Sequence, residues 1–188
     1  MSISPRFTSA DLELLPDIDG VRYEIIDGEL YASRQPDWHH QYTCNEIAGE
    51  LRNWNRHLGL GVTIPAPGLV FAADDDCAPD VVWISRERLA AVQDGAGHLR
   101  AAPELVVEVL SYGATNERRD RDLKLTLYSR RGVREYWLVD WRQQTIEVYR
   151  REQAALRLVA TLANEDTLTS PLLPDFAVSV SGIWPPAI

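Results

Sequence analysis

The sequence predicts an α/β domain in which a mixed central sheet is flanked by helices and preceded by an N-terminal hairpin. Three observations support this fold class. An Asp-Gly dipeptide joins two short β-prone runs near the start of the chain, a long amphipathic helix follows it, and strand-length apolar runs then alternate with a second helix. Strands and helices in this order are expected to pack as one mixed sheet between helices.

The N-terminal third contains the hairpin and the first helix. Residues 23–31 place Asp27-Gly28, the strongest short hairpin signal, between apolar runs. Asp37 is a typical helix N-cap, and apolar residues then recur every three or four positions until Gly59, a typical helix terminator. This face carries His40, Cys44, Ile47, Leu51, Trp54 and Leu58. We therefore expect one long helix between Asp37 and Gly59.

The remaining elements follow from apolar runs and glycine punctuation. Residues 79–84 and 105–110 are nearly uniformly apolar, which is typical of strands covered on both faces. We further expect an extended segment near a sheet edge at 62–72, a short helix at 86–92, a second long helix at 116–131 closed by Gly132, and a hairpin of 135–140 with 145–150 that 156–162 could extend. Asp74-Asp75-Asp76 lacks calcium-loop spacing and is predicted to be a solvated loop.

Length, composition and charge restrict the class of protein. With 188 residues, 45% hydrophobic and 25% charged, the chain is expected to form a single domain over residues 1–188. Its net charge of −9 disfavours binding to nucleic acid by bulk attraction but permits a metal-dependent enzyme. Cys44 and Cys77 form no spaced cluster, and no targeting or membrane-spanning segment is recognisable, so we expect a cytoplasmic protein.

Two carboxylates are the strongest candidates for a metal site. Glu108 interrupts the most apolar strand, where an ionised group costs several kcal/mol unless a cation or donors meet it. The alternative is an edge-strand residue that faces water or pairs with a nearby arginine. Asp80 opens the neighbouring strand; Pro79-Asp80 alone favours a turn, and the pairing with Glu108 favours a site. Two such carboxylates repel each other, and Mg²⁺ or Mn²⁺ would relieve that repulsion.

Three further residues complete the candidate site. Lys124 lies on the same helix side as Asp120, so it either points into the cleft beside the carboxylates or forms a surface pair with Asp120. Glu24 of the hairpin either adds a metal ligand or faces solvent. His40 is either a core histidine or a substrate contact. No phosphate-binding glycine loop, nucleophile elbow or zinc-binding helix motif occurs in the sequence.

The motifs together resemble the Uma-two family. The resemblance is carried by Pro79-Asp80, by residues 104–111 (Glu-Leu-Val-Val-Glu-Val-Leu-Ser), by Arg119-Asp120 with Lys124 and Tyr128, and by residues 132–140 (Gly-Val-Arg-Glu-Tyr-Trp-Leu-Val-Asp). It also includes residues 22–30, His40 and residues 170–174, and so covers nearly the whole chain. This bacterial family has a restriction-endonuclease-like fold and belongs to the PD-(D/E)XK nuclease superfamily.

The resemblance implies a site and an activity. It assigns Asp80, Glu108 and Lys124 as catalytic residues and Asp80, Glu108 and Glu24 as ligands of Mg²⁺ or Mn²⁺. The superfamily lysine normally follows the glutamate by two residues, where this chain has Leu110, and Lys124 is the matching position on the next helix. The segment 112–115 and Trp141 depart from the family pattern, which concerns the loop beside the cleft.

Two functions are compatible with these features. The first is a Mg²⁺-dependent endonuclease that hydrolyses DNA, with His40, Arg119 and Arg121 as substrate contacts and Arg118, Arg119, Arg121, Arg130 and Arg131 as a local basic patch. The second is a catalytically silent binding or scaffolding protein, a homodimer that keeps the nuclease fold. The apolar hairpin around Trp137 either pairs with a second copy or belongs to the core. A close Asp80–Glu108–Lys124 group favours the enzyme, and a Lys124 turned to solvent favours the scaffold.

Overall fold

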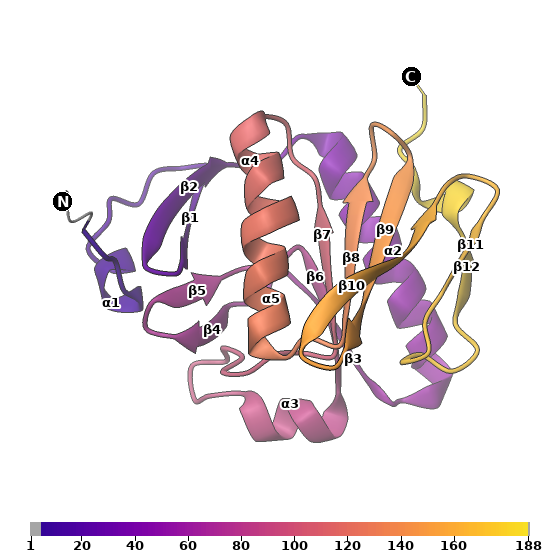
Figure 1. The fold of residues 1–188 in the computed structure, drawn as a ribbon, viewed down its shortest axis with the longest axis horizontal. Helices are drawn as coiled ribbons and strands as arrows, with labels where there is room; N and C mark the ends of the chain where they lie inside the picture. Colours follow the sequence, from indigo (N-terminus) through magenta and orange to yellow (C-terminus); the bar gives the residue numbers. More distant parts are fainter. Residues whose placement is uncertain (1–4, 188) are drawn as a thin grey trace.

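A computed structural model describes residues 5–187, and its centre is a six-stranded mixed sheet (Figure 1). The strand order is β10-β9-β8-β7-β6-β3. The strands are β3 (Gly61–Pro65), β6 (Val81–Ser85), β7 (Leu105–Val109), β8 (Glu135–Asp140), β9 (Thr145–Glu152) and β10 (Ala155–Leu162). Only β7 and β8 pair in parallel, and the helical segment that connects them crosses over the sheet. This mixed pairing confirms the predicted fold class.

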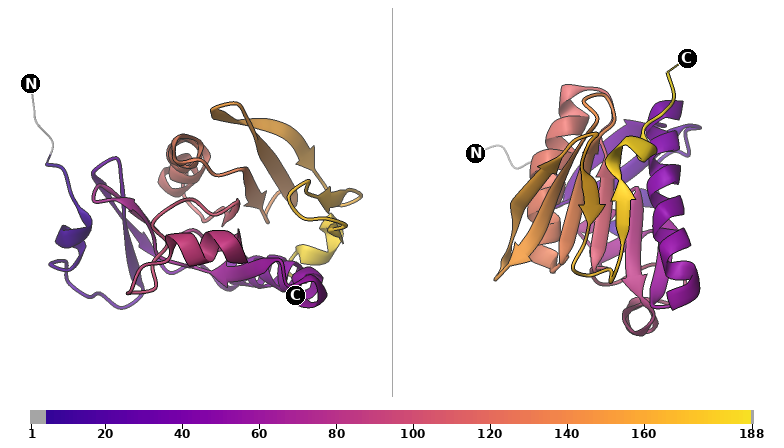
Figure 2. Two further views of the ribbon diagram at one scale, coloured as in Figure 1. Left: turned by 90° about the horizontal axis from the view of Figure 1, so that it is seen from below. Right: turned by 90° about the vertical axis from the view of Figure 1, so that its right-hand side faces the viewer.

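Helices cover both faces of this sheet, as the right-hand view of Figure 2 shows. α2 (Trp38–Leu58) lies on one face, and α4 (Ala114–Arg118) and α5 (Leu125–Arg131) lie on the other, joined by a π-helix (Arg119–Lys124). β7 is buried along its whole length because its side chains alternate between two cores. Val107 packs in the core that contains α2, and Val106 in the core that contains α5.

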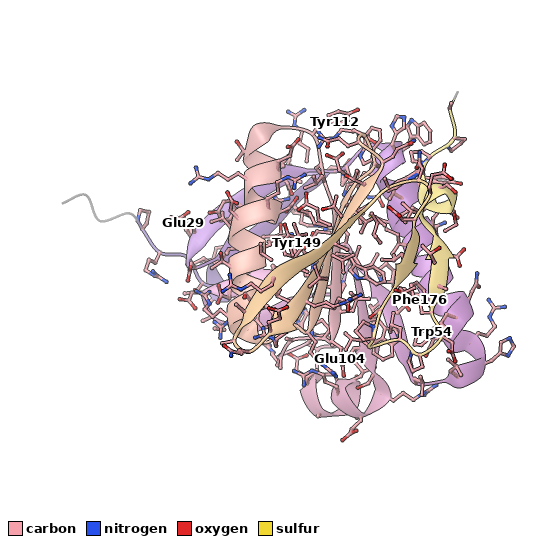
Figure 3. All side chains as sticks on the ribbon, turned by 45° about the vertical axis from the view of Figure 1, so that its right-hand side comes forward. Glu29, Trp54, Glu104, Tyr112, Tyr149 and Phe176 are labelled. Carbon is pink, nitrogen blue, oxygen red and sulfur yellow. The ribbon has the colours of Figure 1, made fainter. Side chains whose placement is uncertain are left out.

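The long helix α2 has the predicted ends. Asp37 accepts hydrogen bonds from the backbone N–H groups of His39 and His40, which are otherwise unsatisfied in the first turn. Gly59 ends the helix in the left-handed conformation at φ 62°. At this end Trp54 packs edge-on against Phe176, with ring centroids 6.0 Å apart, and both are labelled in Figure 3. The C-terminal segment therefore covers the end of α2 that lies farthest from Asp37.

The N-terminal hairpin forms, but it belongs to a second sheet. β1 (Val21–Ile26) and β2 (Glu29–Arg34) are joined by Asp27 and Gly28, both with positive φ, as the predicted tight turn requires. β1 also pairs with β5 (Asp75–Cys77), which gives the order β2-β1-β5-β4 with β4 (Leu69–Ala72). The extended segment 62–72 is thus divided between the two sheets. The sequence predicts one continuous sheet, whereas in the structure the hairpin belongs to a separate four-stranded sheet.

The other elements are short. They comprise α1 (Ser9–Leu12), α3 (Arg86–Val92), β11 (Thr167–Thr169), β12 (Ala177–Ser179) and a 3-10 turn at Val180–Ile183. Trp137 is fully buried and stacks on Phe176, so this side chain belongs to the core and offers no surface to a second copy. No helix within residues 5–187 combines the length and the apolar character that crossing a membrane requires.

The acidic run at 74–76 is not a solvated loop, which corrects the prediction. Asp75 lies in β5 with 1% of its side chain exposed, and Arg130 and Arg131 both bind its carboxylate. Asp75 also accepts the backbone N–H of Asp27 in the hairpin turn. The carboxylate therefore fastens the second sheet to α5, a long-range pairing that no local sequence pattern contains.

Replacing Asp75 by asparagine is expected to lower the free energy of unfolding by about 2–4 kcal/mol, because two guanidinium groups lose the charge that they share. Asp76 is the matched control, since it is half-buried in the same strand and its side chain makes no hydrogen bond within residues 5–187. Urea titrations of both variants measure the effect. A loss in Asp75→Asn no larger than that in Asp76→Asn would contradict this assignment.

Candidate active site

A cavity of about 230 Å³ opens between the hairpin sheet, the first turn of α2 and the π-helix. Its lining includes six of the seven residues that the sequence singles out for the site: Glu24, His40, Asp80, Glu108, Arg119 and Lys124. Arg121 is absent from the lining, and its guanidinium pairs with Glu147 of β9. The structure therefore brings the predicted carboxylates and lysine into one place and leaves Arg121 outside it.

Lys124 is the centre of the cluster. Its ammonium lies 3.0 Å from Glu108 Oε1, 3.0 Å from Glu24 Oε1 and 3.7 Å from Asp120 Oδ1. Only 2% of its side chain is exposed, so the alternative of a surface pair with Asp120 is wrong. Burial opposes the charged form, but the carboxylates of Glu108, Glu24 and Asp120 raise the pKa of Lys124 above its ordinary value. The ammonium therefore stays charged.

Lys124 is also the only lysine among the 19 lysine and arginine residues of the chain. Arginine is the cation at other carboxylates, both exposed ones such as Asp27 and Asp74 and the buried Asp75. An ammonium is a compact point charge, whereas a guanidinium is a planar fork that needs more room. This compositional signal marks the residue independently of any motif.

The π-helix explains why Arg119 and Lys124 both reach the cavity. Arg119 and Lys124 are five residues apart, which in an α-helix would set them about 140° apart around the axis. The wider i→i+5 turn brings both to the inner side together with Asp120, and all three are buried. Arg119 pairs there with Asp120 at 3.1 Å and Glu24 at 3.5 Å. The predicted helix 116–131 is thus present from Ala114, but not as a regular α-helix.

Asp80 is held by β7 and by α2. Its Oδ2 accepts the backbone N–H of Val109 at 2.8 Å and lies 3.3 Å from His40 Nε2. Burial opposes ionisation, but the hydrogen bond and charge of His40 hold the pKa of Asp80 below its ordinary value. Burial likewise opposes protonation of His40, and Asp80 raises the pKa of that imidazole. Asp80 is therefore an ionised carboxylate next to the cavity.

Glu108 has the opposite titration behaviour. It accepts Lys124 Nζ at 3.0 Å and Tyr128 Oη at 2.6 Å on the same oxygen, Oε1. Burial raises the pKa of Glu108 to about 8 despite Lys124, and the charges of Asp80 and Asp120 add to this effect. A dication that approached Glu108 would therefore displace a proton.

Once Glu108 has lost its proton, the cluster contains more negative than positive charge. Glu24, Asp80, Glu108 and Asp120 face only two permanent cations, Lys124 and Arg119, together with the imidazole of His40. Carboxylate oxygens are the donors that Mg²⁺ and Mn²⁺ prefer, and excess negative charge is what a dication relieves. The donor set around Asp80 and Glu108 thus fits such a metal.

Glu24 has a different set of contacts. Its Oε1 accepts the backbone N–H of Ala78 at 3.0 Å as well as Lys124 Nζ, and its Oε2 faces Arg119. Burial opposes ionisation, but Lys124 and Arg119 hold the pKa of Glu24 below its ordinary value. This geometry suits a residue that fixes the lysine better than a metal ligand.

A second group of donors includes sulfur. His40, Cys44 and Asp80 each offer a ligand atom, and these atoms lie within 4.8 Å of one another. Burial raises the pKa of the Cys44 thiol well above its ordinary value, which keeps the sulfur protonated. The oxygen donors of Asp80 and Glu108 therefore remain the better match to a metal.

Of the predicted arginines, only Arg119 is in the lining of the cavity. Four of the five arginines of the proposed basic patch already pair with carboxylates. Arg119 and Arg121 pair in and beside the site, and Arg130 and Arg131 bind Asp75. Arg22 and Arg34 also line the cavity, and neither forms an ion pair within residues 5–187. Strand periodicity contained a signal for Arg22, since it lies two residues before Glu24 and shares its face.

Comparisons with known proteins identify the family and the fold. The model of the Uma2 family, described as "Putative restriction endonuclease", matches residues 9–181. A crystal structure of a "putative nuclease belonging to DUF820" from Anabaena variabilis ATCC 29413 superposes with a TM-score of 0.73 at 18% sequence identity, over 94% of this chain and 97% of that chain. That likeness shows the fold. No curated protein matches the chain. Since the family model covers most of the sequence and the fold agrees, the chain belongs to the Uma2 family.

Proposed function

We propose that this protein is a Mg²⁺- or Mn²⁺-dependent endonuclease that hydrolyses phosphodiester bonds of DNA. The observation that carries the proposal is the buried contact of Lys124 with Glu108 in a cavity that Asp80 also lines. The family description supports the same class of activity. A scaffold would not need its only lysine buried among carboxylates, at a cost in desolvation that only those carboxylates offset.

Each residue has a separate role in this proposal. Asp80 and Glu108 would hold the metal, which supplies a Lewis acid for the phosphate and the attacking water. Lys124 orients that water or stabilises negative charge on the phosphate as the bond breaks. His40 and Tyr128 fix the two carboxylates through the contacts at 3.3 Å and 2.6 Å. Glu24 and Asp120 position the ammonium.

Binding of the DNA backbone would rely on Arg22 and Arg34. Both side chains are exposed at the cavity, and neither has a carboxylate partner within residues 5–187. Two guanidinium groups next to an acidic site would offset the net charge of −9 locally. Arg121 has no part in this proposal, because it lies outside the cavity lining and pairs with Glu147.

We also propose that the protein acts in the cytoplasm. Cys44 and Cys77 are buried free thiols, which suits the reducing cytoplasm. The single domain over residues 1–188 is likewise part of the proposal, and the homodimer stays a prediction.

The direct test is cleavage by the purified protein. Supercoiled plasmid and single-stranded DNA are incubated with Mg²⁺, Mn²⁺ or EDTA, and Mn²⁺ binding is measured by titration. Metal-dependent cleavage that EDTA abolishes is the expected result. If the protein neither cleaves DNA nor binds Mn²⁺, the nuclease proposal is overturned and the scaffold remains.

Metal affinity is expected to increase with pH up to about 8. Glu108 is protonated below that pKa and must lose its proton to bind a cation, so affinity should increase by up to about tenfold per pH unit and then level off. Calorimetric Mn²⁺ titrations at pH 6.5, 7.5 and 9 measure this, and buffers of different ionisation enthalpy count the protons released. Equal affinities at all three pH values would contradict the role of Glu108.

A further inference from the structure

Four aromatic rings lie in contact beside the cavity, three of them stacked and one edge-on, and we call them the aromatic rim. Trp38 stacks on His39 with ring centroids 3.8 Å apart, and His39 stacks on Trp141 at 4.5 Å with planes only 3° apart. Tyr112 meets Trp141 edge-on at 5.5 Å. The rings come from the start of α2, the loop after β7 and the turn after β8. Three separate segments thus hold one continuous group of rings.

The outer rings of the rim are exposed. Trp38 is 45% and Tyr112 59% exposed, and they are the aromatic members of the exposed large hydrophobic residues within 5–187. Figure 3 shows Tyr112 at the upper edge of the molecule. The guanidinium of Arg142 lies 5.4 Å from the centre of the Tyr112 ring and is itself held by Glu117 and Asp140. The rim is therefore held in place from behind and offers aromatic surface to solvent.

The rim adjoins the proposed active site. Trp38 and His39 immediately precede His40, whose imidazole contacts Asp80. A cavity of about 240 Å³ connects Tyr112 with His40 and Ser111, and it shares Arg34, His40 and Ser111 with the catalytic cavity. Another cavity of about 360 Å³, lined by Trp38, Trp141 and Arg142, lies on the other side of the stack.

We propose that the aromatic rim is a nucleobase-stacking subsite and that the substrate is single-stranded DNA. This inference rests on the proposed function and names its substrate class. A base inside a duplex already stacks on its neighbours, so we expect an exposed ring to bind an unpaired base. In this proposal, the base on Trp38 or Tyr112 belongs to a nucleotide that flanks the scissile phosphate. Arg34, exposed in the cavity that the two sites share, contacts a backbone phosphate between the stacked base and the scissile bond.

Binding of fluorescent oligonucleotides in EDTA tests this without cleavage. Anisotropy titrations compare a single-stranded 12-mer with its duplex for the wild type, Trp38→Ala and Tyr112→Ala. Because stacking of one base contributes about 1–3 kcal/mol, each variant is expected to raise the single-strand Kd about 5- to 150-fold and to leave the duplex Kd unchanged. Trp38→Phe and Tyr112→Phe should restore most of the affinity.

Leu158→Ala is the control, since this side chain is 53% exposed on β10, far along the sheet from the rim. A scan of abasic positions along the 12-mer adds a second readout, in which one position should weaken binding to the wild type but not to Trp38→Ala. Equal losses for single strand and duplex, unchanged affinities, or no binding of single strands would each overturn the subsite. If Trp38→Ala still cleaves duplex DNA with metal, the nuclease is retained and the subsite is rejected. If single strands bind in a way that needs Trp38 and Tyr112 but are never cleaved, the subsite is retained and the nuclease is rejected.

Discussion

Replacing Asp80 by asparagine is expected to reduce metal-dependent cleavage by about 10³-fold, because a bound metal contributes several kcal/mol to phosphoryl chemistry. The amide keeps the shape of the side chain and can still accept the N–H of Val109. It removes the charge that would hold the cation and that His40 faces at 3.3 Å. The initial rate of plasmid nicking at saturating Mn²⁺ and the Mn²⁺ Kd are the two measurements.

Asp122→Asn is the control for that substitution. Asp122 lies on the same π-helix as Lys124, but its side chain is exposed and faces away from the cavity. Its cleavage rate should equal that of the wild type. If Asp80→Asn retained both metal binding and cleavage, Asp80 would not be a metal ligand, whatever its place in the cavity.

Replacing Lys124 by methionine is expected to lower cleavage by about 10²- to 10³-fold, the usual cost of losing one charge-stabilising donor. Metal binding should respond in the opposite direction. With the ammonium gone, Glu24, Glu108 and Asp120 lose their shared partner, and a cation meets less competition for Glu108. A tighter Mn²⁺ Kd combined with a slower rate would distinguish this role from simple damage to the fold.

The same substitution should destabilise the metal-free protein by about 3–5 kcal/mol, as expected when one partner of a buried ionic cluster is removed. Added Mn²⁺ should restore part of that loss in thermal unfolding. Lys124→Arg is the informative companion, because it keeps the charge and changes its shape. Wild-type cleavage by Lys124→Met would refute any catalytic part for the lysine.

Local sequence signals predict the elements of this fold well. The Asp27-Gly28 turn, the helix limits at Asp37 and Gly59 and the doubly covered strand around Glu108 all depend on neighbours within a few residues. The buried pairing of Glu108 could be predicted from sequence because a carboxylate inside an apolar run needs a partner. The helix side that carries Asp120 and Lys124 likewise follows from periodicity.

The remaining features depend on long-range pairing. Asp75 reads as part of a charged loop until Arg130 and Arg131, more than fifty residues later, are placed against it. In a regular α-helix Arg119 would point away from Lys124, and only the π-helix brings both side chains to the cavity. The aromatic rim joins residues 38, 39, 112 and 141, which no periodicity connects.

The single buried lysine has a practical consequence for labelling. Amine-selective reagents find no lysine side chain on the surface of this protein, because the only one lies within the carboxylate cluster. The rate at which Lys124 is methylated or acylated therefore measures how often the cavity opens to solvent. After reductive methylation with ¹³C-formaldehyde, the dimethylated ε-amine would give one lysine resonance, and its chemical shift would report metal or nucleic acid directly at the proposed site of reaction.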